Sequence, residues 1–430
     1  MGRPPIKTVA SRTSSWFLIV TLLAATVSPA GLAQSSSLPP RSSDDEAFLD
    51  QLERDAWRYF WDYADRKTGL IADSTLHGSP SSIAAVGFGL AAVCIAHARG
   101  WISSEDAYGR VLKTLRTVKR RLKHEHGFFY HFVEMSTGQR AWSSEVSSID
   151  TALLLAGALF AGQYFHGTPV ERLATELYER VDWTWMTHDT PLLCMGWTPE
   201  RGFFSHHWDW YSEGILLYAL AIGSPTHPIP AESWFKWRRA KRAYRGVSVV
   251  YSYFGSLFTY QTAHAWIDFR TLYEGDLNYW QNSINAVLAN RQFCLDHAAQ
   301  YRGYGPSGWG LTAGEGPDGY RGYGAEPAEV VLHDGTINPY GVVASLPLLP
   351  DVAIASLKEL REAYREKVYG EYGFKAGFNV DRDWWGKTHL GIDEGVSLLM
   401  IENYRTEMVW KTFQQLPSIQ RWIALCLTRR

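Results

Sequence analysis

Apolar residues recur at helical spacing along most of the chain from residue 43 onward. The first series follows Ser43 and three acidic residues, a pattern typical of a helix N-terminus. Its apolar members are Phe48, Leu49, Leu52, Ala56, Tyr59, Phe60 and Tyr63. The same criteria predict further helices over 81–99, 103–123, 147–165, from 169, from 208, and over 231–240, 276–301, 339–349, 350–368, 391–403 and 418–427. Residues 128–142 are predicted to be extended, and 301–338, rich in Gly, Tyr and Pro, to form a functional loop.

Two kinds of helix alternate in this series. Segments such as 81–99 and 147–165 are almost wholly apolar, whereas 43–63 and 103–123 have one apolar face. Wholly apolar helices must be buried on all sides, and amphipathic helices can cover them from outside. We therefore predict an all-α fold with an inner and an outer helical ring, in one domain over 44–430.

The segment 208–228 combines aromatic side chains, two carboxylates and a long apolar run. If a helix begins near Trp208, Asp209 and Glu213 lie on one face of it. Burial by the apolar run would raise the pKa of Glu213 and suit it to general-acid catalysis, while Trp208 and Tyr211 would stack on sugar rings. The alternative interpretation is an ordinary helix start, where Asp209 caps and Glu213 interacts with the helix dipole.

Two more carboxylates, Glu145 and Asp150, flank the predicted start of the helix over 147–165. Ser147 and Asp150 fit a capping box, which requires no further function. Alternatively, both carboxylates face a cleft at the helix N-termini and hold sugar hydroxyls. The residues alone leave both interpretations open.

A third acidic group is the sequence GIDEG at 391–395. Asp393 would lie near a helix start, where the dipole keeps a carboxylate ionised, which suits a general base. At the end of the same helix, Glu402 and Arg405 form either a buried ion pair or part of the substrate site.

Further candidates for substrate binding lie in the aromatic segments. His264 and Asp268 are four residues apart and could pair. The remaining candidates are Trp266, Trp309 and Asp334. His206 and His207 are adjacent and share no helix face, and no His-Glu-x-x-His spacing occurs, so we predict no metal site.

Composition narrows the class of ligand. The 430 residues carry a net charge of −2 without a basic block at a domain end, which argues against nucleic acid as a partner. Aromatic residues make up 14% of the chain and include 19 Trp. That content favours surfaces that stack on flat ligands such as sugar rings.

The N-terminus has the pattern of an export signal. Three basic residues precede an apolar run at 16–27 that is too short to span a bilayer comfortably. We predict a signal peptide over 1–33 and a Ser/Pro-rich linker over 34–43. The mature protein would be periplasmic or secreted, with no stable membrane insertion; an uncleaved anchor is the alternative.

The four cysteines, Cys94, Cys194, Cys294 and Cys426, are too far apart in sequence to form a metal-type pair. In an oxidising compartment they could form two disulfides in any of three pairings. A buried thiol is at least as consistent with the apolar run around Cys94.

Seven sequence blocks then occur in order: SSEVSSIDTALLLAG, WDWYSEGILLYALAIGSPTHPI, AHAWIDFR, NSINAVLANRQFC, GWGLTAGEGPDGY, HDGTINPYG and GIDEG…MIENYR. Together they resemble the bacterial "putative glucoamylase" domain family, which includes the endo-β-1,2-glucanases of glycoside hydrolase family 144. The resemblance runs over about 48–410, nearly the whole predicted domain.

The resemblance implies an (α/α)6 toroid and cleavage of β-1,2-glucan with inversion and without a cofactor. Glu213 matches the family's acid in the YSEG block, and Asp393 matches its base-side Asp. Glu145 matches the acidic residue before the segment that contains Asp150, and it competes with Asp393 for the role of base. That segment has Ser-Ser where Ser-Thr is more usual in the family, a mild departure.

We therefore expect an exported, monomeric endo-β-1,2-glucanase with a β-glucan as its partner. Two alternatives of the same fold stay open: a transglycosylase or exo-acting enzyme on this glucan, and a non-catalytic glucan-binding protein.

Overall fold

The computed structural model describes residues 42–430, and these residues belong to one compact unit. The predicted signal peptide and nearly all of the predicted linker lie outside the described residues. Among the helices that are described, none combines the length and apolarity needed to cross a membrane.

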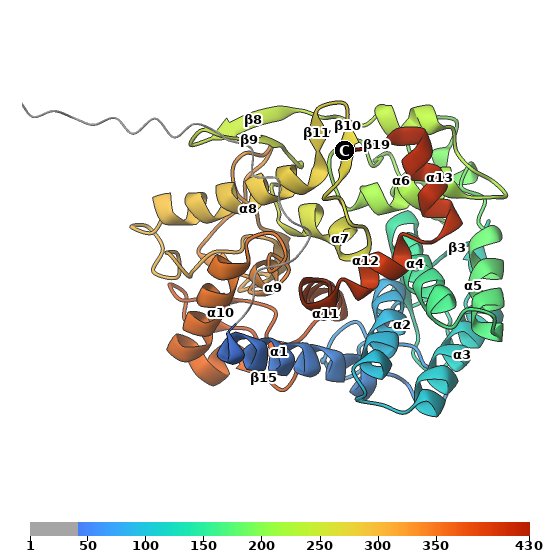
Figure 1. Cartoon of the computed structure of the whole chain (residues 1–430), viewed down its shortest axis with the longest axis horizontal. Coiled ribbons are helices and arrows are strands. Elements are labelled where there is room, and N and C mark those ends of the chain that lie inside the picture. The colour runs from blue at the N-terminus through green and yellow to red at the C-terminus, as the bar shows by residue number, and fades with distance from the viewer. Residues whose placement is uncertain (1–41) are drawn as a thin grey trace, which may run out of the picture. The chain divides into compact units, whose positions relative to one another are not determined.

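Helices of the described chain form two concentric rings (Figure 1). The inner ring consists of α2 (Ile83–Ala98), α4 (Ser148–Tyr164), α6 (Gly214–Gly223), α7 (Phe258–Trp266), α9 (Tyr340–Val343) and α11 (Gly391–Thr406). The outer ring consists of α1 (Ser43–Asp62), α3 (Ser104–Arg121), α5 (Pro169–Glu179), α13 (Pro417–Cys426), α8 (Tyr279–Asp296) and α10 (Pro350–Tyr364). The outer helices pack, in order, against α11, α2, α4, α6, α7 and α9. This arrangement is an (α/α)6 toroid, as expected, with α12 (Met408–Phe413) between α4, α7 and α11.

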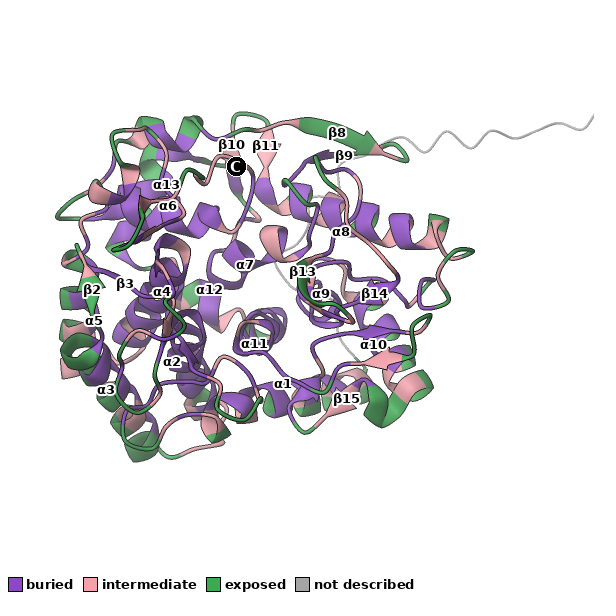
Figure 2. Cartoon of the chain, turned by 180° about the vertical axis from the view of Figure 1, so that it is seen from behind, coloured by how far each residue is buried: buried purple, intermediate pink, exposed green. Residues whose placement is uncertain are grey.

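The inner helices are buried along nearly their whole length because neighbours cover both of their sides (Figure 2). α2 and α4 approach most closely at Gly87 and Gly157. A Cβ atom on Gly157 would lie 1.9 Å from the carbonyl oxygen of Gly87, so only glycine permits this contact. The close packing explains why small residues fill both helices.

Short antiparallel strands occur mostly in the loops that connect the helices. The paired strands are β1 (Ser81–Ser82) with β4 (Phe132–Val133); β2 (His124–Glu125) with β3 (Phe128–Phe129); β5 (Val146–Ser147), β6 (Gly196–Thr198) and β7 (Gly202–Phe203); β8 (Lys241–Tyr244) with β9 (Val247–Val250); β11 (Leu277–Asn278), β10 (Leu272–Glu274) and β19 (Thr428–Arg429); β12 (Ala313–Gly316) with β13 (Gly319–Gly322); β14 (Thr336–Ile337), β17 (Phe378–Asn379) and β18 (Trp384–Trp385); and β15 (Tyr369–Gly370) with β16 (Gly373–Phe374). Single 3₁₀ turns cover Trp185–Thr187, Ala231–Phe235 and Arg365–Lys367.

Several predicted helix boundaries are wrong. The helix expected over 339–349 ends at Val343, and the one expected over 276–301 covers Tyr279–Asp296. The helix expected from 208 begins only at Gly214, because the preceding residues follow an irregular path with isolated bridges to other loops. The helix expected over 231–240 is a 3₁₀ turn followed by the hairpin of β8 and β9. Two short helices, α7 and α12, were not predicted.

All four cysteines are buried free thiols in the described chain, so the disulfide alternative is wrong for the structure and the buried-thiol alternative is confirmed. Burial raises the pKa of Cys94 and Cys294, which keeps these thiols protonated.

Candidate active site

The N-terminal ends of five inner helices meet at one cavity of about 540 Å³. Its wall includes Ser82 before α2, Asp150 in α4, Glu213 before α6, Phe258 in α7 and Ile392 in α11. Each helix directs the positive end of its dipole toward this point, which favours negative charge there. We name this cavity the acid lobe.

Four carboxylates line the acid lobe: Asp73, Asp150, Glu213 and Glu315. They come from separate segments, and Glu315 lies on the β12–β13 hairpin. Tyr320 from the same hairpin also lines the lobe, with 53% of its surface exposed. Trp142 also lines the lobe and is 67% exposed, so its ring is accessible to a sugar.

A second cavity of about 800 Å³ shares Glu213 with the acid lobe. We name it the aromatic lobe, because its lining includes Trp208, Trp210, Tyr211, Tyr253 and Phe254. Glu213 therefore lies where the two lobes meet. The chemistry of the two walls differs: one is rich in carboxylates and the other in aromatic rings.

Arg238 covers the ring of Trp210 at 4.9 Å and forms an ion pair with Asp209 at 3.4 Å. Asp209 is thus part of the aromatic lobe through a tertiary contact. The predictions that Asp209 caps the helix and shares its face with Glu213 are wrong, because Glu213 itself occupies the N-cap position of α6.

Glu213 has the properties of a proton donor. Its Oε2 atom is buried and has no hydrogen-bond partner within residues 42–430. Burial raises the pKa of Glu213 to about 7, and the nearby negative charge of Asp150 adds to this effect. The carboxyl group can therefore hold a proton near neutral pH, as a general acid must.

Asp393 is 3% exposed, and neither of its carboxylate oxygens has a hydrogen-bond partner in the described part of the chain. Burial raises its pKa well above the usual range, and Glu394, Glu315 and Asp73 raise it further. The prediction that the helix dipole keeps Asp393 ionised is therefore wrong. A dipole contributes only about 0.3–1 kcal/mol near the surface, less than the cost of burying a charge beside other anions.

His131 joins two of the predicted acidic residues. Its Nδ1 lies 3.0 Å from Glu145 Oε1, and its Nε2 lies 3.5 Å from Asp150 Oδ1. Burial opposes ionisation of Glu145, but the hydrogen bond and charge of His131, together with the charge of Arg140, outweigh it and lower the pKa of this carboxyl. Asp150 also accepts a 2.5 Å hydrogen bond from Ser147 Oγ, which confirms the capping box. Asp150 therefore serves the helix and faces the cleft at once.

His131, Glu145 and Asp150 are also a geometric candidate for a metal site, since one ligand atom from each lies within 4.8 Å of the others. The two carboxylates, however, face different ring nitrogens. Protons on those nitrogens satisfy both contacts, so the arrangement is explained without an ion.

Three predicted substrate-binding residues belong to the core: His264, Trp266 and Trp309 are 1%, 0% and 0% exposed. His264 Nε2 lies 2.7 Å from Ser283 Oγ, and Trp309 donates to Ser356 Oγ at 2.9 Å. Direct contact with substrate is therefore excluded for them in this structure, and their roles were predicted wrongly. Aromatic content alone did not distinguish the core from the cleft.

Two more predicted contacts lie outside both lobes. Asp268 forms a two-pronged ion pair with Arg270 instead of pairing with His264. Asp334 accepts a hydrogen bond from the backbone N–H of Thr336 at 3.0 Å, which stabilises its own loop.

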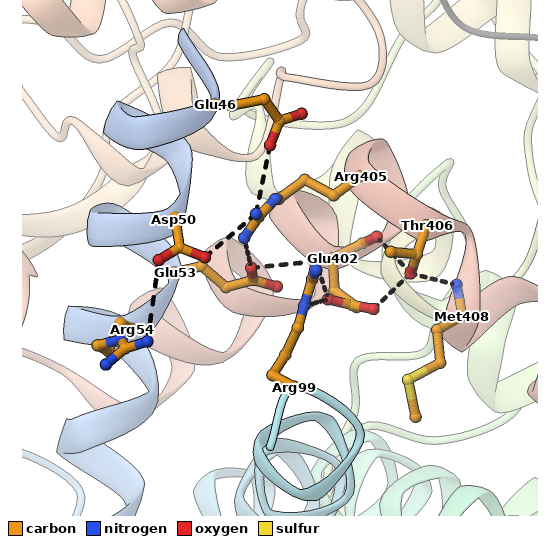
Figure 3. Close-up of polar contacts among 9 residues, drawn as sticks. All are labelled: Glu46, Asp50, Glu53, Arg54, Arg99, Glu402, Arg405, Thr406 and Met408. Atoms are coloured by element: carbon orange, nitrogen blue, oxygen red, sulfur yellow. Dashed lines mark hydrogen bonds and ion pairs between the residues drawn. The ribbon is translucent and has the colours of Figure 1, made fainter. Parts of the chain in front are cut away.

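Glu402 is 1% exposed and lies in an ion-pair network at the far end of α11 (Figure 3). Arg99 donates to Glu402 at 2.8 Å through Nε and lies 3.3 Å from Glu53 through Nη2. Arg405 contacts Glu53 in the same network. Glu402 thus belongs to a buried ion-pair network, but its partner there is Arg99, whereas the predicted partner Arg405 contacts Glu53. The substrate-binding interpretation of Glu402 is wrong.

Asp73, His131 and Glu315 were not predicted from the sequence as site residues. Tyr320 was included only as part of a long predicted loop. Burial raises the pKa of Asp73 to about 6, with Asp150 and Glu315 contributing and His131 opposing. Glu315 lies in the glycine-rich segment predicted to be functional, so that signal was present. Asp73 and His131 lie in short extended segments without a distinguishing local pattern.

Comparison with known proteins agrees with this fold. Residues 205–417 match the family model described as "Putative glucoamylase". The endo-β-1,2-glucanase of Chitinophaga pinensis, solved with sophorotriose and glucose, superposes with a TM-score of 0.83 at 27% identity, covering 90% of this chain and 99% of that one. A protein of Bacteroides fragilis solved as a "putative glucoamylase" gives a TM-score of 0.81 at 29% identity, covering 92% and 100%.

An exo β-1,2-glucooligosaccharide sophorohydrolase (non-reducing end) of Parabacteroides distasonis is 28% identical over 91% of this chain. The chain spans 59% of the length of that relative. The fold and the carboxylate-lined cleft define an (α/α)6 toroid of the glucoamylase-like class. Within that class, residues 205–417 of the chain match the "Putative glucoamylase" family model, the family that the seven sequence blocks resemble.

Proposed function

We propose that the protein is a glycoside hydrolase that cleaves β-1,2-glucan within the chain. The observation that carries this proposal is the position of Glu213 between two cavities of about 540 and 800 Å³. A carboxyl with a pKa of about 7 at the junction can protonate a bond whose two sides occupy different lobes. The relatives named for β-1,2-glucan supply the substrate class.

In the proposed reaction, Glu213 donates its proton to the glycosidic oxygen as the bond breaks. Asp393 accepts a proton from the attacking water. Its raised pKa makes it a stronger base than an ordinary aspartate once it is ionised, and both of its oxygens lack partners among the described residues. Attack by water on the face opposite the leaving group inverts the anomeric centre.

The two lobes support the internal mode of cleavage, because each offers space for sugar rings on its own side of Glu213. An exo mode is the second candidate, because the Parabacteroides distasonis relative carries that name. The two modes differ in product distribution. Internal cleavage releases a ladder of oligosaccharides early in the reaction, whereas exo cleavage releases one short product throughout.

The test is incubation of purified protein with linear β-1,2-glucan, with products separated by size over time and the first anomer read by NMR. We expect a ladder and the α-anomer. A single disaccharide from the first minute would establish the exo mode. Release of the β-anomer would establish retention and direct attention to Glu145 as a nucleophile. Absence of any product, with glucan binding intact, would favour a binding protein.

We also propose export of the protein, on the basis of the predicted signal over 1–33. The mature protein in the periplasm or medium should begin near Gln34, and mass spectrometry would show it. Light scattering of that sample tests the expected monomer.

A further inference from the structure

His131 lines the wall of the acid lobe, where it lies between two carboxylates. His77 lines the same cavity. Two hydrogen bonds hold the backbone of His131, and one stacking contact restricts its ring. The backbone N–H of His131 donates to the carbonyl oxygen of Glu145 at 2.9 Å, and its carbonyl accepts from Ile83 at 3.1 Å. The ring of Phe132 stacks on the imidazole at a centroid distance of 3.8 Å. The imidazole therefore has little freedom to turn away from its acidic neighbours.

Each ring nitrogen of His131 faces a different carboxylate oxygen, at 3.0 Å for Glu145 and 3.5 Å for Asp150. A neutral imidazole carries one N–H and one lone pair, so it can donate to only one of the two. The other nitrogen would then direct its lone pair at an anionic oxygen, which is repulsive. Only the doubly protonated ring makes both contacts favourable.

The surrounding charges agree with this geometry. The carboxylates that act on His131 are Asp150 and Glu145, with Asp73 adding to their effect, and together they outweigh the cost of burial and raise its pKa to about 9. Arg140 is a second cation near Glu145, but it is bound to Glu200 at 2.6 Å and to the carbonyl oxygen of Ser144. It therefore does not replace the imidazolium.

We propose that His131 is a positioning residue, whose imidazolium holds Glu145 ionised and orients both Glu145 and Asp150 beside the acid lobe. Its effect on catalysis passes through these carboxylates. The negative charge of Asp150 raises the pKa of Glu213, so the orientation of Asp150 affects how well this acid retains its proton.

The effect on turnover rests on the proposed hydrolysis of β-1,2-glucan, but the protonation of His131 does not. The first experiment therefore uses free enzyme labelled with ¹³C at histidine Cε1 and follows the imidazole signals by NMR from pH 5 to pH 10. The signal missing from the His131→Gln or His131→Lys variant is assigned to His131. We expect it to stay protonated at pH 7 and to titrate near 9. Titration at or below the ordinary value of about 6.5 would overturn the proposal.

The second experiment compares kcat/KM against pH for wild type, His131→Gln and His131→Lys. Loss of an adjacent cation raises carboxylate pKa values by about 1–3 units, so the acid limb of the His131→Gln profile should move up by about that much. His131→Lys restores the charge and should move the limb back. A uniform loss of activity at every pH in both variants would show that His131 only fills space, and would overturn the positioning role.

Stability gives an independent check on the same charge. Because the folded-state pKa of His131 is raised, its stabilising contribution is complete below about 6.5 and is lost as pH rises through 9. The difference in Tm between wild type and His131→Gln should therefore shrink above pH 9. A difference that is constant with pH would contradict the imidazolium. Wild-type enzyme without activity on glucan would refute the proposed function and leave the NMR result intact.

Discussion

The two ends of α11 carry buried carboxylates in opposite circumstances. Glu402, near the C-terminal end, is 1% exposed and contacts the guanidinium of Arg99 at 2.7 Å. Asp393, in the first turn, is 3% exposed, and both of its oxygens lack hydrogen-bond partners in residues 42–430. Both carboxylates are almost completely buried, but only Glu402 has a cationic partner among the described residues.

This difference separates structural from functional acids in this protein. At the Glu402 end, three helices or their caps contribute cations and anions that form ion pairs with one another (Figure 3). At the Asp393 end, Asp73 and Glu315 line the acid lobe, and their charges add to burial in raising the pKa of Asp393, which lies behind the residues that line the lobe. Uncompensated buried acids destabilise a fold, so their presence in a cleft indicates a task in catalysis or binding.

The largest loss of activity is expected from a substitution in the cleft. Glu213→Gln keeps the shape of the side chain and removes its acidic proton, so turnover on unactivated β-1,2-glucan should fall by about 10²- to 10⁴-fold. The unfolding free energy should stay the same or rise, because an unpartnered buried acid is removed. Near-normal turnover in this variant would remove Glu213 from the mechanism.

Asp393→Asn should cause a loss of similar size, about 10²- to 10⁴-fold, because water loses its proton acceptor. Glucan binding, measured by calorimetry, should persist. The matched variant Glu145→Gln should lose less activity, since Glu145 is engaged by His131. A reversed ranking of the two variants would transfer the role of base to Glu145.

At the other end of α11, Arg99→Met should lower the unfolding free energy by about 3–5 kcal/mol, because it leaves Glu402 and Glu53 buried without this guanidinium. Urea denaturation measures the change. Arg120→Met on the exposed face of α3 is the control and should change stability by less than about 0.5 kcal/mol. Equal effects of the two substitutions would mean that burial does not distinguish the network.

The pH dependence of turnover should report the state of Glu213. Because its pKa is raised to about 7, the protonated acid is lost as pH rises through 7, and kcat should decline there. The stability effect has the same direction: the contribution of Glu213 is complete below its unfolded value of about 4.5 and is lost as pH rises toward 7. Glu213→Gln should abolish this part of the stability profile, which thermal unfolding at several pH values can show.

The smallest effect should come from the rim of the acid lobe. Trp142→Ala removes an exposed ring that can stack on a sugar, so KM should rise about two- to tenfold with little change in kcat. Phe235 is also exposed but lies outside the lining of both lobes, so Phe235→Ala should leave KM unchanged. Identical KM values for the two variants would exclude Trp142 from substrate contact.

The amphipathic periodicity was sufficient to predict the two rings, because apolar faces must be buried whatever their partners. The ranges of α2, α3 and α4 were predicted to within about two residues, since Ser caps and apolar runs define them locally. The helix expected from 208 failed because the chain there pairs with distant loops, and no local pattern shows those partners.

For the site, sequence identified the acids that begin inner helices, since capping patterns and apolar runs place Asp150, Glu213 and Asp393 at helix starts. It could not show which carboxylates receive a cation. Glu402 is hydrogen-bonded to Arg99, which is 303 positions away in sequence, and Glu145 is hydrogen-bonded to His131, 14 positions away. Both hydrogen bonds exist only after folding. The protonation states follow from those tertiary contacts, because burial and neighbouring charge, not residue type, determine where a carboxyl keeps its proton.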